Sequence, residues 1–140
     1  MSKAETKRKK TDAEAFGDLP RQIQQAAHAA QDKKAGDLAV LDVREVSSFT
    51  DYFVICSGQS ARQVKAIADA VEETLLKDRA RPAHVEGYDR AEWVLLDYFD
   101  FIVHIFTPTM RDFYGLERLW GSAARIPVPE PAGRAADTNR

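Results

Sequence analysis

The spacing of apolar residues along the chain predicts an amphipathic helix over residues 19–34. Asp18 is expected as its N-cap, with Pro20 in the first turn and Gly36 just past the end. The apolar face consists of Leu19, Ile23, Ala26, Ala27 and Ala30. This face is narrow, so we expect the helix to lie at the edge of the core.

A second helix is predicted from Ser60 to about Lys77. Ser60 and Gln63 have the spacing of a capping box, in which each side chain bonds the backbone amide of the other residue. Apolar residues then recur at helical spacing: Val64, Ile67, Ala68, Val71 and Leu75.

Short runs of branched and aromatic residues predict five strands. Residues 38–43 and 52–56 are almost entirely apolar, so we expect both strands to be buried on two faces. A short strand is expected at 84–86. Residues 93–98 and 101–106 are separated by Phe99 and Asp100, which suits a tight antiparallel hairpin.

A last helix is predicted over residues 111–120, with Phe113, Leu116 and Trp120 on one side. The order of elements is therefore helix, two strands, helix, three strands and helix. This order predicts an α/β fold in which helices pack on a mixed β-sheet.

The two ends of the 140-residue chain differ from its middle. Residues 1–15 lack apolar periodicity and predict a disordered basic tail. The Lys-Arg-Lys-Lys run at 7–10 is most simply a solvated terminus, with peripheral contact to RNA as the rival hypothesis. Residues 122–140 contain Pro127, Pro129 and Pro131 and predict a second disordered tail. One folded domain is expected over residues 16–121.

Charge separates the ends from the body of the chain. The whole chain has 20 basic and 22 acidic residues, a net charge of -2. Residues 1–17 and 122–140 carry eight basic and five acidic side chains, which leaves 12 basic and 17 acidic side chains for residues 18–121. That body, with a net charge of -5, repels a phosphate backbone and favours a basic partner.

Cysteine usage and hydropathy indicate the compartment. A single cysteine, Cys56, excludes an internal disulfide and a cysteine-based zinc site and favours a reducing environment, so we expect a cytoplasmic protein. No apolar run reaches the roughly 18 to 20 residues that span a bilayer. The first residues also lack the apolar segment of a signal peptide. We therefore expect no membrane contact.

The residues offer two candidate enzymatic sites, and neither is favoured. The turn at 57–60 could hold an anion on its amides, but a P-loop lysine and the spaced glycines of a dinucleotide site are absent, so a simple helix cap is preferred. Asp97 and Asp100 could bind magnesium, but residues three apart on a strand point to opposite faces, and both are typical turn formers. A magnesium-dependent nucleotidyltransferase or a nucleotide-binding protein stays the alternative hypothesis.

Histidine and cysteine add little chemistry. Cys56 lies in an apolar strand with no basic neighbour in sequence, which predicts a buried, inert thiol. His84 and His104 lack the spacing of a metal site. His104 alternates with Ile102 and Phe106, so it is either half-buried and hydrogen-bonded or a polar contact for a partner.

Aromatic and charged residues near the hairpin and the last helix are candidates for a partner-binding surface. Trp93 and Tyr98 flank the hairpin, and Arg111, Tyr114 and Glu117 recur at three-residue intervals. Such residues are typical of interface anchors and equally of core edges. From these patterns alone we predict a small non-enzymatic α/β domain that binds a basic partner.

Several motifs in the same order resemble the ribosomal silencing factors, also called the Iojap family, across residues 19–120. They are Asp37 with Leu-Ala-Val-Leu-Asp-Val at 38–43, Ser-Phe-Thr-Asp-Tyr-Phe-Val-Ile-Cys-Ser-Gly at 48–58, Ser-x-Arg-Gln-Val at 60–64, Glu86 with Gly87, Trp-Val-Leu-Leu-Asp-Tyr at 93–98, Asp-Phe-Ile-Val-His at 100–104 and Arg-Asp-Phe-Tyr-Gly-Leu-Glu-Arg-Leu-Trp at 111–120. Phe99 stands where the family usually has glycine, so an altered turn is expected there.

The resemblance implies a nucleotidyltransferase-like topology without the catalytic residues and without a cofactor. It implies a translational repressor that binds the large ribosomal subunit through ribosomal protein fourteen and sterically blocks joining of the small subunit, especially when nutrients are limiting. A homodimer is expected off the ribosome. From their place in the matched motifs, we expect the partner-binding residues to be Trp93, Asp97, Asp100, His104, Arg111, Tyr114 and Glu117.

Overall fold

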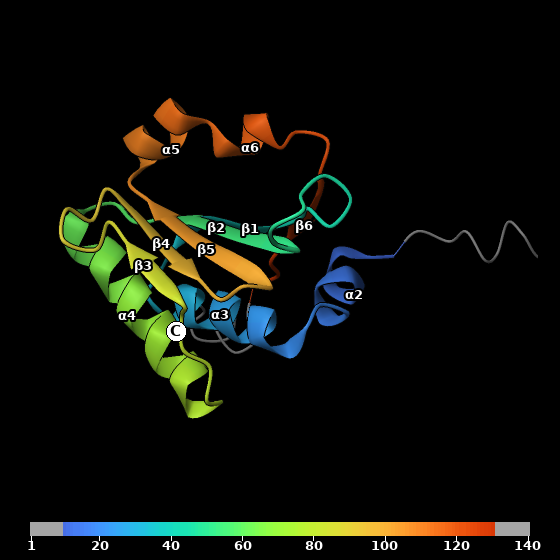
Figure 1. Ribbon diagram of the computed structural model, residues 1–140, viewed down its shortest axis with the longest axis horizontal. Coiled ribbons are helices and arrows are strands. Elements are labelled where there is room, and N and C mark those ends of the chain that lie inside the picture. Colours follow the sequence, from blue (N-terminus) through green and yellow to red (C-terminus); the bar gives the residue numbers. More distant parts are fainter. Residues whose placement is uncertain (1–9, 131–140) are drawn as a thin grey trace, which may run out of the picture.

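Six strands form one mixed sheet in the order β3-β4-β5-β2-β1-β6 (Figure 1). The computed structural model describes residues 10–130, so the outer parts of both predicted tails, 1–9 and 131–140, lie outside the described residues. The strands are β1 (Gly36–Asp42), β2 (Tyr52–Ser57), β3 (His84–Glu86), β4 (Trp93–Asp97), β5 (Phe101–Phe106) and β6 (Ala124–Pro127). This arrangement confirms the predicted mixed-sheet α/β fold.

The centre of the sheet is the parallel pair of β2 and β5, in which Val54 lies opposite Val103. Both strands are buried along their whole length, as their continuous apolar sequences predict. The other neighbouring strands pair antiparallel, including β4 with β5 in the predicted hairpin. Because the hairpin reverses the chain, the residues that begin β4 and end β5 lie together at one end of the sheet.

Two long helices, α3 (Arg21–Asp32) and α4 (Ala61–Lys77), cover one face of the sheet (Figure 1). The predicted stripe of α4 is fully buried against this face. The prediction that the first helix lies at the core edge is wrong, because Ala26, Ala27 and Ala30 have no exposed surface. Their small side chains let the backbone of α3 approach its neighbours closely, so a narrow face suffices for burial.

The first helical segment begins differently from its prediction. Asp18 is not the N-cap of α3; it is the C-cap of a short additional helix, α2 (Asp12–Gly17). Thr11 and Glu14 form a complete capping box for α2, and Phe16 is buried. The predicted disordered tail over 1–15 is therefore wrong from Thr11 onward. One apolar anchor and a cap order this turn without apolar periodicity.

The capping box predicted for α4 forms only in part. The Ser60 hydroxyl accepts from the amide of Gln63 at 3.1 Å, as expected. The Gln63 side chain instead accepts from the Gln59 amide at 2.6 Å and donates to the carbonyls of Lys33 and Lys34. Gln63 therefore joins the start of α4 to the end of α3.

The C-terminal part of the domain also departs from the prediction. The last helix is two short helices, α5 (Pro108–Tyr114) and α6 (Leu116–Leu119), because Gly115 adopts a left-handed φ of 58° between them. Residues 124–127 form β6, which pairs antiparallel with β1, so the predicted tail over 122–140 is wrong there. Proline is tolerated in β6 because this strand lies at the edge of the sheet.

Candidate functional site

A chain of seven aromatic rings crosses the sheet face opposite α3 and α4. We call it the aromatic cluster, and its members in order of ring contact are Phe113, Tyr114, Trp93, His104, Phe53, Trp120 and Phe49. Helices α5 and α6 cover this face only in part (Figure 1). Phe113 is 73% exposed, Phe49 62% and Tyr114 50%. The cluster is therefore buried at its centre and open at both ends.

Trp93 is held at the centre by contacts on several sides. Its ring lies 4.6 Å from that of Tyr114 and 4.9 Å from that of Phe106, measured between centroids. Its indole Nε1 donates a hydrogen bond to Nδ1 of His104 at 3.0 Å. Phe106 lies opposite Trp93 in the β4–β5 pairing and His104 is two residues away along β5, so both face the same side of the hairpin as Trp93.

His104 is buried and hydrogen-bonded, not a surface contact. Its side chain is packed edge-on against Phe53, with ring centroids 4.9 Å apart. Burial lowers the pKa of His104 to about 3, so the imidazole is neutral at pH 7. Since Nδ1 accepts from Trp93, the remaining proton lies on Nε2. The predicted hydrogen bond of His104 is confirmed. The side chain is buried rather than half-buried, and it accepts its hydrogen bond from the indole of Trp93.

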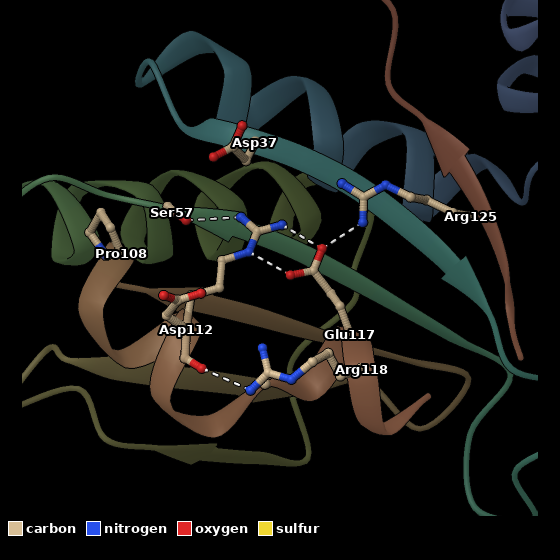
Figure 2. A pocket seen from close by; sticks show the side chains of 9 residues that line it. Asp37, Ser57, Pro108, Asp112, Glu117, Arg118 and Arg125 are labelled. Carbon is tan, nitrogen blue, oxygen red and sulfur yellow. Dashed lines mark hydrogen bonds and ion pairs between the residues drawn. The ribbon is translucent and has the colours of Figure 1, made fainter. Parts of the chain in front are cut away.

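Arg111 and Glu117 come together in a second group. Figure 2 shows Glu117 of this group with Ser57 and Arg125 nearby. Arg111 donates two bonds to the Glu117 carboxylate, both at 2.9 Å, and a third to the Ser57 hydroxyl at 2.8 Å. Arg125 in β6 reaches the same carboxylate at 2.5 Å. These bonds, from Arg111 first, lower the pKa of Glu117 to about 2 despite its partial burial. The group joins β2, α5, α6 and β6.

The cavity at this group has a volume of about 540 Å³ and mixed charge. Its lining includes three arginines and three carboxylates, namely Arg111, Arg118, Arg125, Asp37, Asp112 and Glu117. Arg111 is already bonded to protein groups, and Arg118 donates to the carbonyl of Asp112 (Figure 2). The amides of Gly58 and Gln59 donate to Phe106 and Gln63, so they are not available to an anion. These bonds disfavour a nucleotide site at the turn.

Asp97 and Asp100 lie at the other end of the hairpin from Trp93. The Asp97 carboxylate accepts from the amide of Phe99 at 2.8 Å, which confirms its role as a turn former. The carbonyl of Asp100 accepts from the amide of Asp51 at 3.0 Å. The structure thus divides the seven predicted residues into three groups. Trp93, His104 and Tyr114 form one, Arg111 with Glu117 the second, and the two aspartates the third.

The aromatic cluster includes residues that were not among the predicted partner-binding residues, such as Phe49 and Trp120. Phe49 and Trp120 contact each other at 6.2 Å between ring centroids, although they are far apart in sequence. Phe49 lies in the matched motif at 48–58 and Trp120 ends the last one, so the motifs themselves contained the signal. The residue type alone did not assign Phe49 or Trp120 to partner binding, because an aromatic side chain can be exposed or buried and the sequence does not distinguish the two.

Other chemistry finds little support in the described part of the chain. Within residues 10–130, no three His, Cys, Asp or Glu side chains are placed to hold a metal ion. Burial raises the pKa of the Cys56 thiol to about 12, which keeps it protonated and unreactive. No helix in the same range combines the length and apolar character needed to cross a bilayer.

The fold and this site together define a small mixed-sheet α/β domain that presents exposed aromatic residues around a fixed, buried centre. Comparison with known proteins then identifies the family. The profile of the family described as "Ribosomal silencing factor during starvation" matches residues 17–140, nearly the whole chain. The chain therefore belongs to the ribosomal silencing factors, as its motifs predicted.

Individual relatives agree with this assignment. The ribosomal silencing factor of Bacillus subtilis is 43% identical over 98 residues, which cover 70% of this chain and 83% of that protein. The mouse protein "Mitochondrial assembly of ribosomal large subunit protein 1" is 35% identical over 91 residues, 63% of this chain and 40% of its own. A crystal structure from Chromobacterium violaceum has a TM-score of 0.70 and 34% identity, covering 79% of this chain and 89% of that one.

Proposed function

We propose that this protein represses translation, especially when nutrients are limiting, by binding ribosomal protein fourteen of the large subunit and excluding the small subunit. The observation that carries the proposal is the aromatic cluster, whose exposed ends flank a rigid, buried centre. Exposed aromatic residues fixed by such a centre are typical interface anchors. The acidic body favours a basic partner and disfavours bare RNA. The name of the mouse relative also refers to the large ribosomal subunit.

Repression in this proposal needs no chemistry, so we infer that the protein is not an enzyme. Three observations support this inference: the bonded amides of Gly58 and Gln59, the turn-forming Asp97 and the protonated Cys56 thiol. A cytoplasmic location, a homodimer off the ribosome and peripheral RNA contact by the N-terminal tail stay predictions from the sequence. The rival enzymatic hypothesis requires saturable binding of a nucleoside triphosphate with magnesium, which calorimetry measures directly.

Cosedimentation with purified large subunits tests the docking surface. Tyr114→Ala removes a half-exposed ring at one end of the aromatic cluster, and we expect it to weaken binding by at least about fivefold, the effect of an ordinary interface anchor. The same variant should lose the ability to prevent subunit joining in a sucrose gradient. Leu76→Ala is the matched control, because Leu76 is 45% exposed on α4, against the opposite face of the sheet. Equal binding by both variants contradicts the proposed surface.

A further inference from the structure

Phe99, at the tip of the β4–β5 hairpin, combines two unfavourable features. Its φ is 72°, in the left-handed region that favours glycine, and its side chain is 71% exposed. No aromatic contact involves Phe99 among residues 10–130. A glycine or asparagine would adopt this turn more easily, so neither the backbone nor the packing of the domain explains a phenylalanine here.

The tip is held firmly from both sides. The amide of Phe99 donates to the Asp97 carboxylate at 2.8 Å, and its carbonyl accepts from the Thr50 hydroxyl at 2.9 Å. One residue further on, the amide of Asp51 donates to the carbonyl of Asp100 at 3.0 Å. The ring of Phe99 is therefore presented on a fixed backbone. This lowers the entropy lost when a partner binds it.

Residues with carboxylate side chains adjoin this tip and indicate what kind of partner fits. The hydrogen bonds at the tip involve three aspartates, Asp51, Asp97 and Asp100. An adjacent cavity of about 420 Å³ is lined in part by Asp51 and Asp100. Arg21 in this cavity pairs with Asp78 at 3.5 Å, and Arg44, which pairs with Asp42, also attracts Asp51. Within the described residues, Asp97 and Asp100 form no ion pair. The free charge at the tip is thus negative, which opposes stacking of a nucleotide base because its phosphate would be repelled.

We propose that the Phe99 tip is a second interaction surface, which binds an arginine-bearing segment of a basic protein. A guanidinium can stack on an aromatic ring and pair with a carboxylate at the same time. The tip offers the Phe99 ring and the Asp97 carboxylate bonded to the Phe99 amide, with Asp100 next to Phe99 in sequence. The tip lies at the opposite end of the hairpin from Trp93, so this contact is separate from the aromatic cluster. It therefore does not depend on the proposed docking surface.

An NMR titration of the isolated protein tests the proposal, with a short oligo-arginine peptide as the probe. We expect saturable shifts of the amide signals at 50–51 and 97–101, and weaker binding of an oligo-lysine peptide of equal length. Phe99→Gly should reduce the affinity about three- to fivefold, the effect of losing an exposed cation–π contact. Because the substitution also relieves the backbone, the thermal midpoint should not fall. Phe99→Trp should keep or increase the affinity.

Two controls keep the test decisive. Asp100→Asn removes the charge but not the ring and should weaken binding without changing the turn, because only the backbone carbonyl of Asp100 bonds to Asp51. Leu76→Ala is the matched apolar control, since Leu76 is exposed beside the carboxylates of Asp69, Glu72 and Glu73 but is not aromatic. Shifts that map to residues 69–76, or wild-type affinity in Phe99→Gly, overturn the proposal.

Two other occupants give different results and also overturn it. A single-stranded RNA that shifts the tip more than the peptide does would indicate base stacking. Concentration-dependent broadening of the tip signals without any ligand, abolished by Phe99→Gly, would indicate a second copy of this chain. Each experiment uses the free protein, so a failure here leaves the ribosome proposal standing, and a failure to bind ribosomes leaves this one standing.

Discussion

At the scale of single residues, the hydrogen bond from Trp93 to His104 requires a neutral imidazole. A neutral imidazole accepts from the indole through Nδ1, whereas an imidazolium carries protons on both nitrogens and cannot accept. Burial keeps the pKa of His104 near 3, well below that of an exposed histidine. The anchor at the centre of the aromatic cluster therefore keeps its hydrogen bond throughout the physiological pH range.

The first prediction concerns the pH dependence of stability. The folded pKa of His104 is lowered, so the unfolded chain takes up a proton between about pH 6.5 and pH 3 while the folded chain does not. This contribution to stability is complete above about pH 6.5 and is lost as the pH falls, by up to about 1.4 kcal/mol per pH unit. Urea denaturation at pH 7, 6 and 5 measures the slope. His104→Gln should flatten it, and equal slopes in both proteins contradict the assignment.

At the scale of elements, one ionic group fixes the corner where the chain leaves the sheet. Gly115 separates α5 from α6, and an added Cβ there would collide with the guanidinium of Arg118. Across this corner, Glu117 in α6 bonds Arg111 in α5 and Arg125 in β6. The carboxylate thus holds three short elements that bury little surface of their own. Tyr114 is the last residue of one of these elements, α5.

Glu117→Gln is expected to lower the free energy of unfolding by about 1 to 3 kcal/mol at pH 7, because Arg111 is largely buried and would lose its charged partner. Wild-type protein should lose the same stability in acid, since the lowered folded pKa makes this contribution complete above about pH 4.5 and lost as the pH falls toward 2. Glu92→Gln is the control, because its pair with Arg90 is exposed and 3.6 Å long. Chemical denaturation compares the variants, and equal stabilities contradict this role.

At the scale of the whole molecule, the described ends of the chain are parts of the fold. Phe16 in α2 is buried and packs against His28 in α3, with ring centroids 5.5 Å apart. At the other end, β6 extends the sheet beyond β1, and the Pro129 carbonyl accepts from the Gln31 side chain at 2.7 Å. Both segments pack against the acidic body, which we expect to dominate recognition of a basic partner.

Truncation and salt dependence distinguish ribosome binding by the acidic body from ribosome binding by the N-terminal tail. Deleting residues 1–9 should leave binding to the large subunit largely intact, whereas deleting residues 1–17 removes Phe16 and should cost about 2 kcal/mol or more of stability. If the body makes the main contact, much of the affinity should persist through physiological salt. A log–log slope of about -3 to -4 that disappears with residues 1–9 would instead assign the contact to the basic tail and RNA. Cosedimentation at several salt concentrations measures both.

The sequence by itself determined the elements whose burial follows a regular period. The apolar stripe of α4 is buried when it packs on a sheet, and the continuous apolar runs of β2 and β5 are buried when both faces are covered. Local sequence was therefore enough to predict that these segments form a helix and two strands, and where each lies in the chain. The same holds for the hairpin of β4 and β5, whose loop length restricts the connection. The motifs added the family, and with it the expected partner.

Only the tertiary structure decided which residues work together. The parallel pairing of β2 with β5, the addition of β6 to β1 and the burial of Phe16 depend on contacts between distant segments, which no local pattern records. The same contacts place His104 beneath Trp93, join Arg111 to Glu117 and Arg125, and leave Phe99 exposed. A side chain's exposure and hydrogen-bond partners are set by what packs across the sheet, so the sequence could name these candidates but could not group them.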